Sequence, residues 1–184
     1  DFKKNKNAVS LTYTLNSSYG SGVVIPDTGI LMNNEMDDFS IKPGFPNQFG
    51  LLGSHANAIK PFKRPLSSMT PTILKKNNKL FMTTGTPGGS RIITTVLQSI
   101  LNTVVFDMDL KLSSDALRIH HQWKPDILFL ETGIPNTTKN ALDDIGYNTY
   151  IGSPNTSSNT IMIKNNIFYG YGDKRRQDSK AKGP

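Results

Sequence analysis

The chain has 184 residues, 36% of them hydrophobic and 19% charged, with a net charge of +7 and no cysteine. This length suits one domain of ordinary size, and the recurring patterned apolar residues argue against a disordered chain. The composition excludes disulfides, thiolate zinc sites and a cysteine nucleophile, and no apolar run approaches the roughly 20 residues of a membrane span.

Most of the positive charge lies at the two ends. Residues 173–184 contain five basic and two acidic side chains, and the first seven residues contain three lysines and one aspartate. The ends therefore carry +5 of the +7, and we interpret them as solvated segments, with 173–184 as a basic C-terminal tail. The near-neutral body argues against nucleic-acid binding. The first residue is Asp rather than Met, which fits a chain that begins partway through a longer product.

The first elements expected along the chain are a strand and a hairpin. Apolar side chains occupy every second position of residues 7–16, which predicts a strand with one dry face and one hydroxyl-rich face. Residues 22–32 predict a short hairpin that turns at residues 26–29. Residues 33–65 have no periodicity and contain many glycines and prolines, and loops of this length are often functional.

Regular elements resume at residue 72. Two strands, 72–76 and 79–84, predict a hairpin, and the glycine-rich residues 85–90 lead into a helix. The apolar residues of that helix are expected to form one stripe: Ile93, Val96, Leu97, Ile100, Leu101, Val104 and Val105. The remaining expected elements are a short helix capped by Ser113 or Ser114, strands over 127–131, 147–151, 159–163 and 167–171, and a helix over 135–145. This mixture predicts sheet layers covered by helices.

The turn at residues 85–90 offers the clearest chemistry. Gly88 and Gly89 let a ligand approach the backbone closely, and the first amides of the following helix attract anions or developing oxyanions. No Gly-Lys-Ser/Thr sequence follows, so a nucleotide P-loop is disfavoured. A plain strand-to-helix turn remains an open alternative.

Other candidate residues are weaker when taken alone. Glu35 and Asp38 belong to an acidic turn that could hold a cation or could simply be exposed, and Ser67 and Ser68 could bind a carboxylate. The pair His120–His121 lacks a metal-binding motif, so we interpret it as packing. No G-x-S-x-G elbow is present. The residues alone indicate a binding cleft with an anion-binding turn.

Four stretches in order resemble the small subunit of γ-glutamyltranspeptidase. They are NAVSLTYTLN at 7–16, LMNNEMDDF at 31–39, KRPLSSM at 63–69 and GTPGGSRII at 85–93, and residues 116–125 also fit. The resemblance implies an α+β fold, the αββα four-layer sandwich of the N-terminal nucleophile hydrolases, completed by a large subunit from the same precursor. Residues 1–172 would be the small, catalytic subunit and 173–184 its basic tail.

This resemblance also implies an activity. The family precursor cleaves itself, and the new N-terminal Thr attacks γ-glutamyl amides such as glutathione. Water, an amino acid or a peptide then accepts the γ-glutamyl group, with no metal or cofactor. The family's initial Thr-Thr-His has no counterpart here, since about five residues are missing before Asp1. Either those residues precede Asp1 in the natural protein, which we favour, or the chain is a truncated, inactive form. A periplasmic or secreted location is implied by the family alone.

Residue roles follow from the resemblance by position. Thr14 would hydrogen-bond the catalytic Thr. The α-ammonium of the γ-glutamyl group would be held by Asn16, Glu35 and Asp38. Its α-carboxylate would bind Ser67 and Ser68, together with an Arg of the large subunit.

The remaining roles concern the oxyanion and the lid. The amides of Gly88 and Gly89 would form the oxyanion hole. Phe49 stands where many bacterial members have a lid Tyr, which implies a more open pocket. Thr86 replaces the usual Ser of the glycine turn, a change we expect to be tolerated.

Two alternatives remain. An acylase of the same fold would act on glutaryl-type or cephalosporin amides, but such substrates would leave Glu35 and Asp38 without a cation. A non-catalytic basic protein would instead bind nucleic acid with a steep salt dependence.

Overall fold

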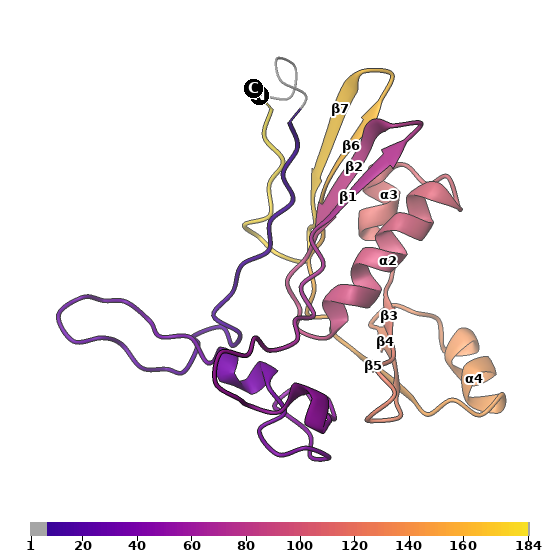
Figure 1. Cartoon of the computed structure of the whole chain (residues 1–184). Helices are drawn as coiled ribbons and strands as arrows, with labels where there is room; N and C mark the ends of the chain where they lie inside the picture. Colours follow the sequence, from indigo (N-terminus) through magenta and orange to yellow (C-terminus); the bar gives the residue numbers. More distant parts are fainter. Residues whose placement is uncertain (1–6, 184) are drawn as a thin grey trace. The chain divides into compact units, whose positions relative to one another are not determined.

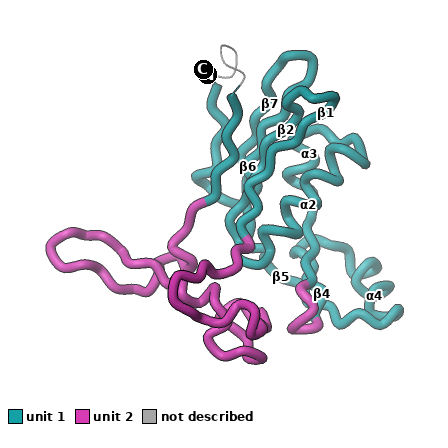
Figure 2. The backbone as a smooth tube through the Cα atoms, viewed as in Figure 1, with its two compact units in different colours: residues 1–12, 69–121, 127–184 teal, residues 13–68, 122–126 magenta. Residues whose placement is uncertain are grey.

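The computed structural model describes residues 7–183. They form two compact units, the first made of residues up to 12, 69–121 and from 127 onward, and the second of residues 13–68 and 122–126 (Figure 2). Lys3, Lys4 and Lys6 of the predicted basic N-terminal end, and Pro184, lie outside the described residues. Among the described helices, none has the length and apolar character that a membrane crossing requires.

The first unit is built on a four-stranded antiparallel sheet in the order β1-β2-β6-β7 (Figure 1). Its strands are β1 (Thr72–Lys76), β2 (Lys79–Gly85), β6 (Asn159–Lys164) and β7 (Ile167–Gly172). Both hairpins turn through pairs of left-handed asparagines, Asn77–Asn78 and Asn165–Asn166, with φ between 51° and 61°. Asparagine tolerates this conformation, which matches the twist of the flanking strands, so the predicted hairpins are confirmed.

Helix α2 (Arg91–Val104) packs on this sheet, but not with the predicted stripe. Val96 is 2% exposed, whereas Ile93 and Leu97 are each 52% exposed. The buried face is rich in small hydroxyl residues, including Ser99 and Thr103. Their hydroxyls donate to the carbonyls one turn earlier, at 2.9 and 3.0 Å, so these polar groups are satisfied within the helix. Five of the seven residues of the predicted apolar stripe are therefore exposed.

Helix α3 (Leu110–Asp115) covers the same face of the sheet, beside β6 and β7 (Figure 1). Its N-cap is Asp109, whose carboxylate accepts a 2.8 Å hydrogen bond from the Leu112 amide. The predicted caps, Ser113 and Ser114, are instead buried inside the helix. The prediction that Ser113 or Ser114 caps the helix is therefore wrong. The helix begins earlier, at Leu110, and the Asp109 carboxylate caps its first turn.

A second sheet in this unit has the order β3-β4-β5. It contains β3 (Ile119–His120), β4 (Leu128–Glu131) and β5 (Thr149–Gly152), with α4 (Asn136–Asp144) between the parallel strands β4 and β5. The two-residue strand β3 was not predicted, because a strand this short leaves no periodicity.

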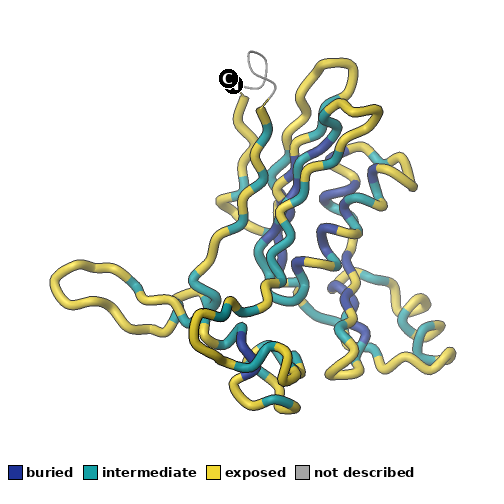
Figure 3. The backbone as a smooth tube through the Cα atoms, in the orientation of Figure 1, coloured by how far each residue is buried: buried dark blue, intermediate teal, exposed yellow. Residues whose placement is uncertain are grey.

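The strand predicted over residues 7–16 does not form. Val9, Leu11 and Tyr13 are between 73% and 86% exposed. Figure 3 colours this stretch as exposed or intermediate, with no buried part. One contact to the sheet is the 2.9 Å hydrogen bond from Ser10 Oγ to the Thr84 carbonyl. Alternation assigns side chains to faces, but a strand also requires a neighbouring backbone and a layer that covers its apolar face.

The second unit consists mostly of turns. It contains two 3-10 helices, η1 (Glu35–Asp38) and η2 (His55–Asn57), within the long irregular stretch that was predicted. The predicted hairpin at 22–32 is confirmed by the Val24–Leu31 bridge and by a 2.9 Å hydrogen bond from the Ile25 amide to the Ile30 carbonyl. We call residues 22–32 the arm.

The C-terminal tail is not simply solvated. Asp173 is 0% exposed and pairs with buried Arg118, while Arg175 Nε donates to Glu131 Oε1 at 2.6 Å. Burial opposes ionisation of Asp173, but the amides of Arg175 and Ser158 and the Arg118 guanidinium outweigh it and lower the pKa of Asp173. The interpretation of this tail as a solvated segment is therefore wrong at its start, because arginine can be buried when each charge has a partner.

Candidate functional site

The residues assigned by sequence are divided between the two units. The second unit contains Thr14, Asn16, Glu35, Asp38, Phe49, Ser67 and Ser68, and the first contains Gly88 and Gly89. The two sets are therefore described separately.

Glu35 and Asp38 form a pair of partly buried carboxyl groups in η1. Glu35 Oε1 is buried, and no residue within 7–183 offers it a hydrogen bond. Burial, followed by the hydrogen bond and charge of Asp38, raises the pKa of Glu35. Burial and the charge of Asp37 raise the pKa of Asp38, although its hydrogen bond with Glu35 works in the opposite direction. Two poorly solvated carboxyl groups and one unsatisfied oxygen are suited to a cation that donates hydrogen bonds.

Thr14 and Asn16 belong to a loop that is hydrogen-bonded to the residue before Glu35. Asn16 has a left-handed backbone with φ of 75°, and its Nδ2 donates to the Asn34 carbonyl at 3.2 Å. The Asn16 amide donates to Thr14 Oγ1 at 2.8 Å. Asn34 in turn accepts from the Ser17 amide at 2.9 Å. The residue that precedes Glu35 is thus fixed to the loop that contains Thr14 and Asn16.

The loop of Phe49 is an ordered turn rather than a free flap. Asn47 Oδ1 accepts from the Phe49 and Leu51 amides, both at 3.0 Å, and the Phe49 carbonyl accepts from Gln122 Nε2 at 2.9 Å. The amide of Gln48 donates to Asp37 Oδ2 at 3.3 Å. The loop therefore lies against η1, and Phe49 itself is half-buried.

Ser67 and Ser68 follow a residue that is connected to η1. The Leu66 amide donates to Asn57 Oδ1 at 3.0 Å, and Asn57 Nδ2 donates to the Asp38 carbonyl at 2.7 Å. Ser67 is exposed and Ser68 is half-buried. The structure therefore connects the serine pair and the acidic pair within one unit.

The glycine turn of the first unit has the geometry that its sequence indicated. Gly88 and Gly89 have φ of 136° and 57°, values that disfavour side chains, and α2 begins at Arg91. A Cβ on Gly88 would lie 2.4 Å from Thr156 Cγ2. The Thr86 hydroxyl accepts from the Ser157 amide at 3.0 Å. The segment around Thr156 thus holds the turn in place, and Thr86 contributes to that contact.

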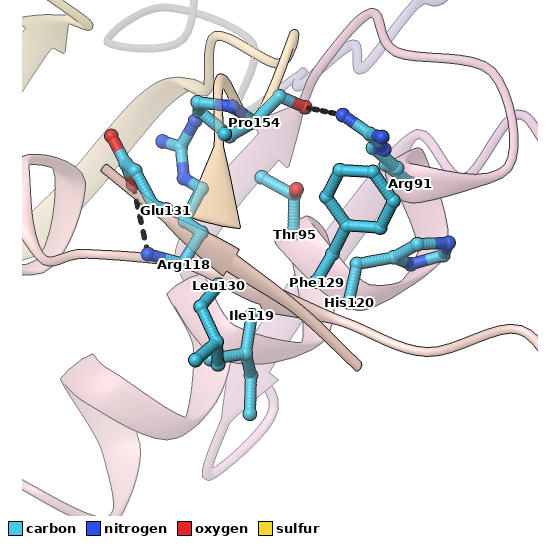
Figure 4. Close-up of a pocket in the computed structure, with 10 residues that line it drawn as sticks. Arg91, Thr95, Arg118, Ile119, His120, Phe129, Leu130, Glu131 and Pro154 are labelled. Carbon is cyan, nitrogen blue, oxygen red and sulfur yellow. Dashed lines mark hydrogen bonds between the residues drawn. The ribbon is translucent and has the colours of Figure 1, made fainter. Parts of the chain in front are cut away.

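A pocket beside this turn contains residues that the sequence did not single out (Figure 4). The Arg91 guanidinium lies 4.0 Å from the centre of the Phe129 ring and donates to the carbonyls of Ser153 and Pro154, at 2.9 and 3.1 Å. The two carbonyl partners of Arg91 lie about 60 positions away, so no local pattern could have identified them. His120 lines the same pocket, is buried, and lies 2.9 Å from Thr94 Oγ1 through its Nδ1, so the packing interpretation is confirmed for this residue. It is wrong for His121, which directly follows β3 and is exposed, because successive side chains along a strand point to opposite sides.

Comparison with known proteins identifies the family. The γ-glutamyltranspeptidase family profile matches residues 2–183. A glutathione hydrolase proenzyme of Escherichia coli (strain K12) is 46% identical over 98% of this chain and 31% of that protein. The chain thus spans about a third of the length of the curated relatives it matches.

Solved structures agree with this match. A mutant γ-glutamyltranspeptidase of Helicobacter pylori superposes with a TM-score of 0.89 and 51% identity, covering 92% of this chain and 94% of the solved chain. The enzyme of Pseudomonas nitroreducens in complex with L-DON gives 0.92 and 38%, covering 98% and 96%. The predicted fold is therefore confirmed as that of the small-subunit portion. Because the family profile spans nearly the whole chain, the chain belongs to the γ-glutamyltranspeptidase family.

Proposed function

We propose that the protein containing this chain cleaves γ-glutamyl amides such as glutathione and passes the γ-glutamyl group to water or to an amino-acid or peptide acceptor. The observation that carries the proposal is the Glu35–Asp38 pair, with its raised pKa values and the unsatisfied Glu35 Oε1. An α-ammonium group would supply the missing positive charge and hydrogen bonds.

The nucleophile in this proposal is an N-terminal Thr that precedes Asp1 in the mature subunit. Its hydroxyl attacks the γ-carbonyl carbon while its own α-amino group takes the proton, and the leaving amine then accepts that proton. The Gly88 and Gly89 amides stabilise the oxyanion. Water or an acceptor amine next attacks the ester, and the Thr oxygen leaves with a proton. Thr14 orients the nucleophile, and Ser67 and Ser68 bind the α-carboxylate.

The Phe49 loop affects how easily water reaches the proposed site. A phenyl ring cannot make the hydrogen bond of a tyrosine, so the proposed pocket is more open to water than in members with the lid Tyr. Hydrolysis should then compete well with transfer at a given acceptor concentration.

The proposed partner is a large subunit from the same precursor. Five apolar side chains of the arm are between 37% and 57% exposed: Val23, Val24, Ile25, Ile30 and Met32. Contiguous exposed apolar surface of this kind usually marks an interface. The relatives carry about two thirds of their length outside the matched region, which is enough to supply the covering layer. For location we propose the periplasm or the outside of the cell, which fractionation would test.

The central experiment uses the full-length precursor. We expect two chains on maturation, the smaller beginning with Thr a few residues before Asp1, as read by N-terminal sequencing. The mature protein should hydrolyse a γ-glutamyl anilide, and Asp38→Ala should lose at least about 100-fold in kcat/KM, since a charged hydrogen bond and a counter-charge disappear. Asp144→Ala, at an exposed position at the end of α4 and outside the proposed site and interface, is the matched control. Full activity of Asp38→Ala would refute the ammonium site, and preferred turnover of a glutaryl anilide would favour the acylase alternative.

A further inference from the structure

Asn57 connects the two groups of residues that would bind the substrate. Its Nδ2 donates to the Asp38 carbonyl at 2.7 Å, and its Oδ1 accepts from the Leu66 amide at 3.0 Å. Leu66 directly precedes Ser67 and Ser68, and Asp38 ends η1. One side-chain amide thus spans from the acidic pair to the segment of the serine pair.

The main chain of Asn57 strengthens this connection. The Ser40 amide donates to the Asn57 carbonyl at 3.0 Å, and Ser40 forms a parallel bridge with Ala58. The Asn57 amide donates to the Ser54 carbonyl at 3.1 Å, which closes η2. Asn57 is therefore held on the η1 side by its backbone as well as its side chain, while its Oδ1 reaches the segment that leads to the serines.

The chemistry of the proposed substrate explains why this distance matters. The α-ammonium and α-carboxylate of a γ-glutamyl group are attached to the same carbon atom, so their separation is fixed. A site that binds both groups must hold its acceptors and donors at a matching distance, and errors of about 1 Å weaken binding strongly. The residues of the two subsites are about 30 positions apart in an irregular segment, which alone would not fix that distance.

We propose that Asn57 is a positioning residue that sets the spacing between the carboxylates of η1 and the serine pair. The inference rests on the proposed function. Asn57 does not touch the substrate in this role, and it acts through the backbone of Asp38 and Leu66. Its removal should therefore weaken ligands that use both subsites more than ligands that use one.

The test compares Asn57→Asp and Asn57→Leu in the mature full-length protein. Asn57→Asp keeps an acceptor for the Leu66 amide but loses the donor to the Asp38 carbonyl, and Asn57→Leu loses both. Asn102→Asp is the matched control, since half-buried Asn102 similarly donates to the Ser113 carbonyl, at 3.3 Å, between α2 and α3. The probes are L-glutamate, which has both α-groups, 4-aminobutyrate, which lacks the α-carboxylate, and glutarate, which lacks the α-ammonium. Each is measured as a competitive inhibitor of γ-glutamyl anilide hydrolysis.

We expect the inhibition constant of L-glutamate and the KM of the anilide to rise about tenfold in Asn57→Asp, the effect of one lost hydrogen bond. The constants of 4-aminobutyrate and glutarate should change by less than about threefold, and kcat should change little. The ratio of the L-glutamate constant to that of 4-aminobutyrate or glutarate should be unchanged in Asn102→Asp. These ratios do not depend on the amount of active enzyme, so partial misfolding does not obscure them.

Equal weakening of all three inhibitors in Asn57→Asp would overturn the inference while leaving the proposed function intact. Unchanged inhibition constants for all three would do the same. Failure of both Asn57 variants to mature while Asn102→Asp matures would also overturn it, because Asn57 would then serve folding. A wild-type protein without γ-glutamyl turnover would overturn the proposed function itself, together with the inference that rests on it.

Discussion

Gly88 and Thr156 approach each other so closely that a Cβ on Gly88 would lie 2.4 Å from Thr156 Cγ2 and 3.1 Å from the Asn155 carbonyl oxygen. Together with φ of 136°, this contact makes glycine a requirement at the first position of the proposed oxyanion hole.

Gly88→Ala should therefore lower kcat by at least about 100-fold, the usual effect of displacing one oxyanion donor. Initial rates of γ-glutamyl anilide hydrolysis would measure the loss. Gly146→Ala is the control for backbone strain alone, because Gly146 has φ of 98° but open space around its Cβ. Thr156→Ser removes the clashing methyl group, so Gly88→Ala/Thr156→Ser should recover part of the activity. No recovery would indicate that the backbone angle, rather than the contact, is decisive.

Glu35→Gln should separate binding from stability. The neutral amide loses a charged partner for the α-ammonium, so KM should rise about 10- to 100-fold. The raised pKa of Glu35 means that its ionised form is disfavoured in the folded protein, so its ionisation costs stability at neutral pH. The variant should unfold at a higher temperature than the wild type at pH 7. The difference should vanish below about pH 4, near the pKa of a glutamate in the unfolded chain. A lower unfolding temperature at pH 7 would contradict this account.

The same raised pKa values predict the pH dependence of substrate binding. A cation binds the ionised form of Glu35 and Asp38, so binding must release any proton held by the pair. The KM for a γ-glutamyl donor should therefore rise as pH falls through these raised pKa values. Glutarate, which has no ammonium group, should not show this rise in its inhibition constant. Parallel pH profiles for both ligands would count against the assignment.

Asp173→Asn should destabilise the protein by about 3–5 kcal/mol at pH 7, because it leaves Arg118 buried without its counter-charge. Since the folded pKa of Asp173 is lowered, its contribution is complete above the unfolded pKa of about 3.9 and is lost as pH falls further. Denaturant unfolding of both proteins from pH 7 to pH 3 would show the difference shrinking. Asp143→Asn, in the partly exposed pair with Lys139, should change stability much less at any pH. A similar effect of the two variants would show that burial of the Arg118 pair is unimportant.

Several elements were predictable because they depend on neighbours in sequence. The hairpin of β1 and β2 follows from two apolar segments around Asn77–Asn78, and the arm follows from its own turn. The glycine turn before α2 was predictable for the same reason. Residues 7–16 show the opposite case, since their alternation is clear but a strand partner cannot be specified by the segment itself.

The candidate site likewise has features that the sequence predicted and features that it did not. The motifs identified Glu35, Asp38, Ser67 and Ser68, and the structure adds what holds them. Three asparagines at 34, 47 and 57 fasten the acidic turn to the neighbouring segments through side-chain amides. Asparagine in an irregular stretch has no pattern that distinguishes such a role from an ordinary turn residue, so sequence reasoning missed all three.

The net charge of +7 shows most clearly what can and cannot be predicted from the sequence. The sequence by itself determined that the charge lies at the ends, that no cysteine or membrane span contributes, and that four motifs occur in the order of one family. Only the tertiary structure decided that Arg175 and Asp173 enter a buried network with Glu131 and Arg118. It also decided that Glu35 Oε1 is left unsatisfied among the described residues. Turns, motifs and charge are properties of adjacent residues, whereas burial and charge pairing depend on groups that the fold brings together from distant positions.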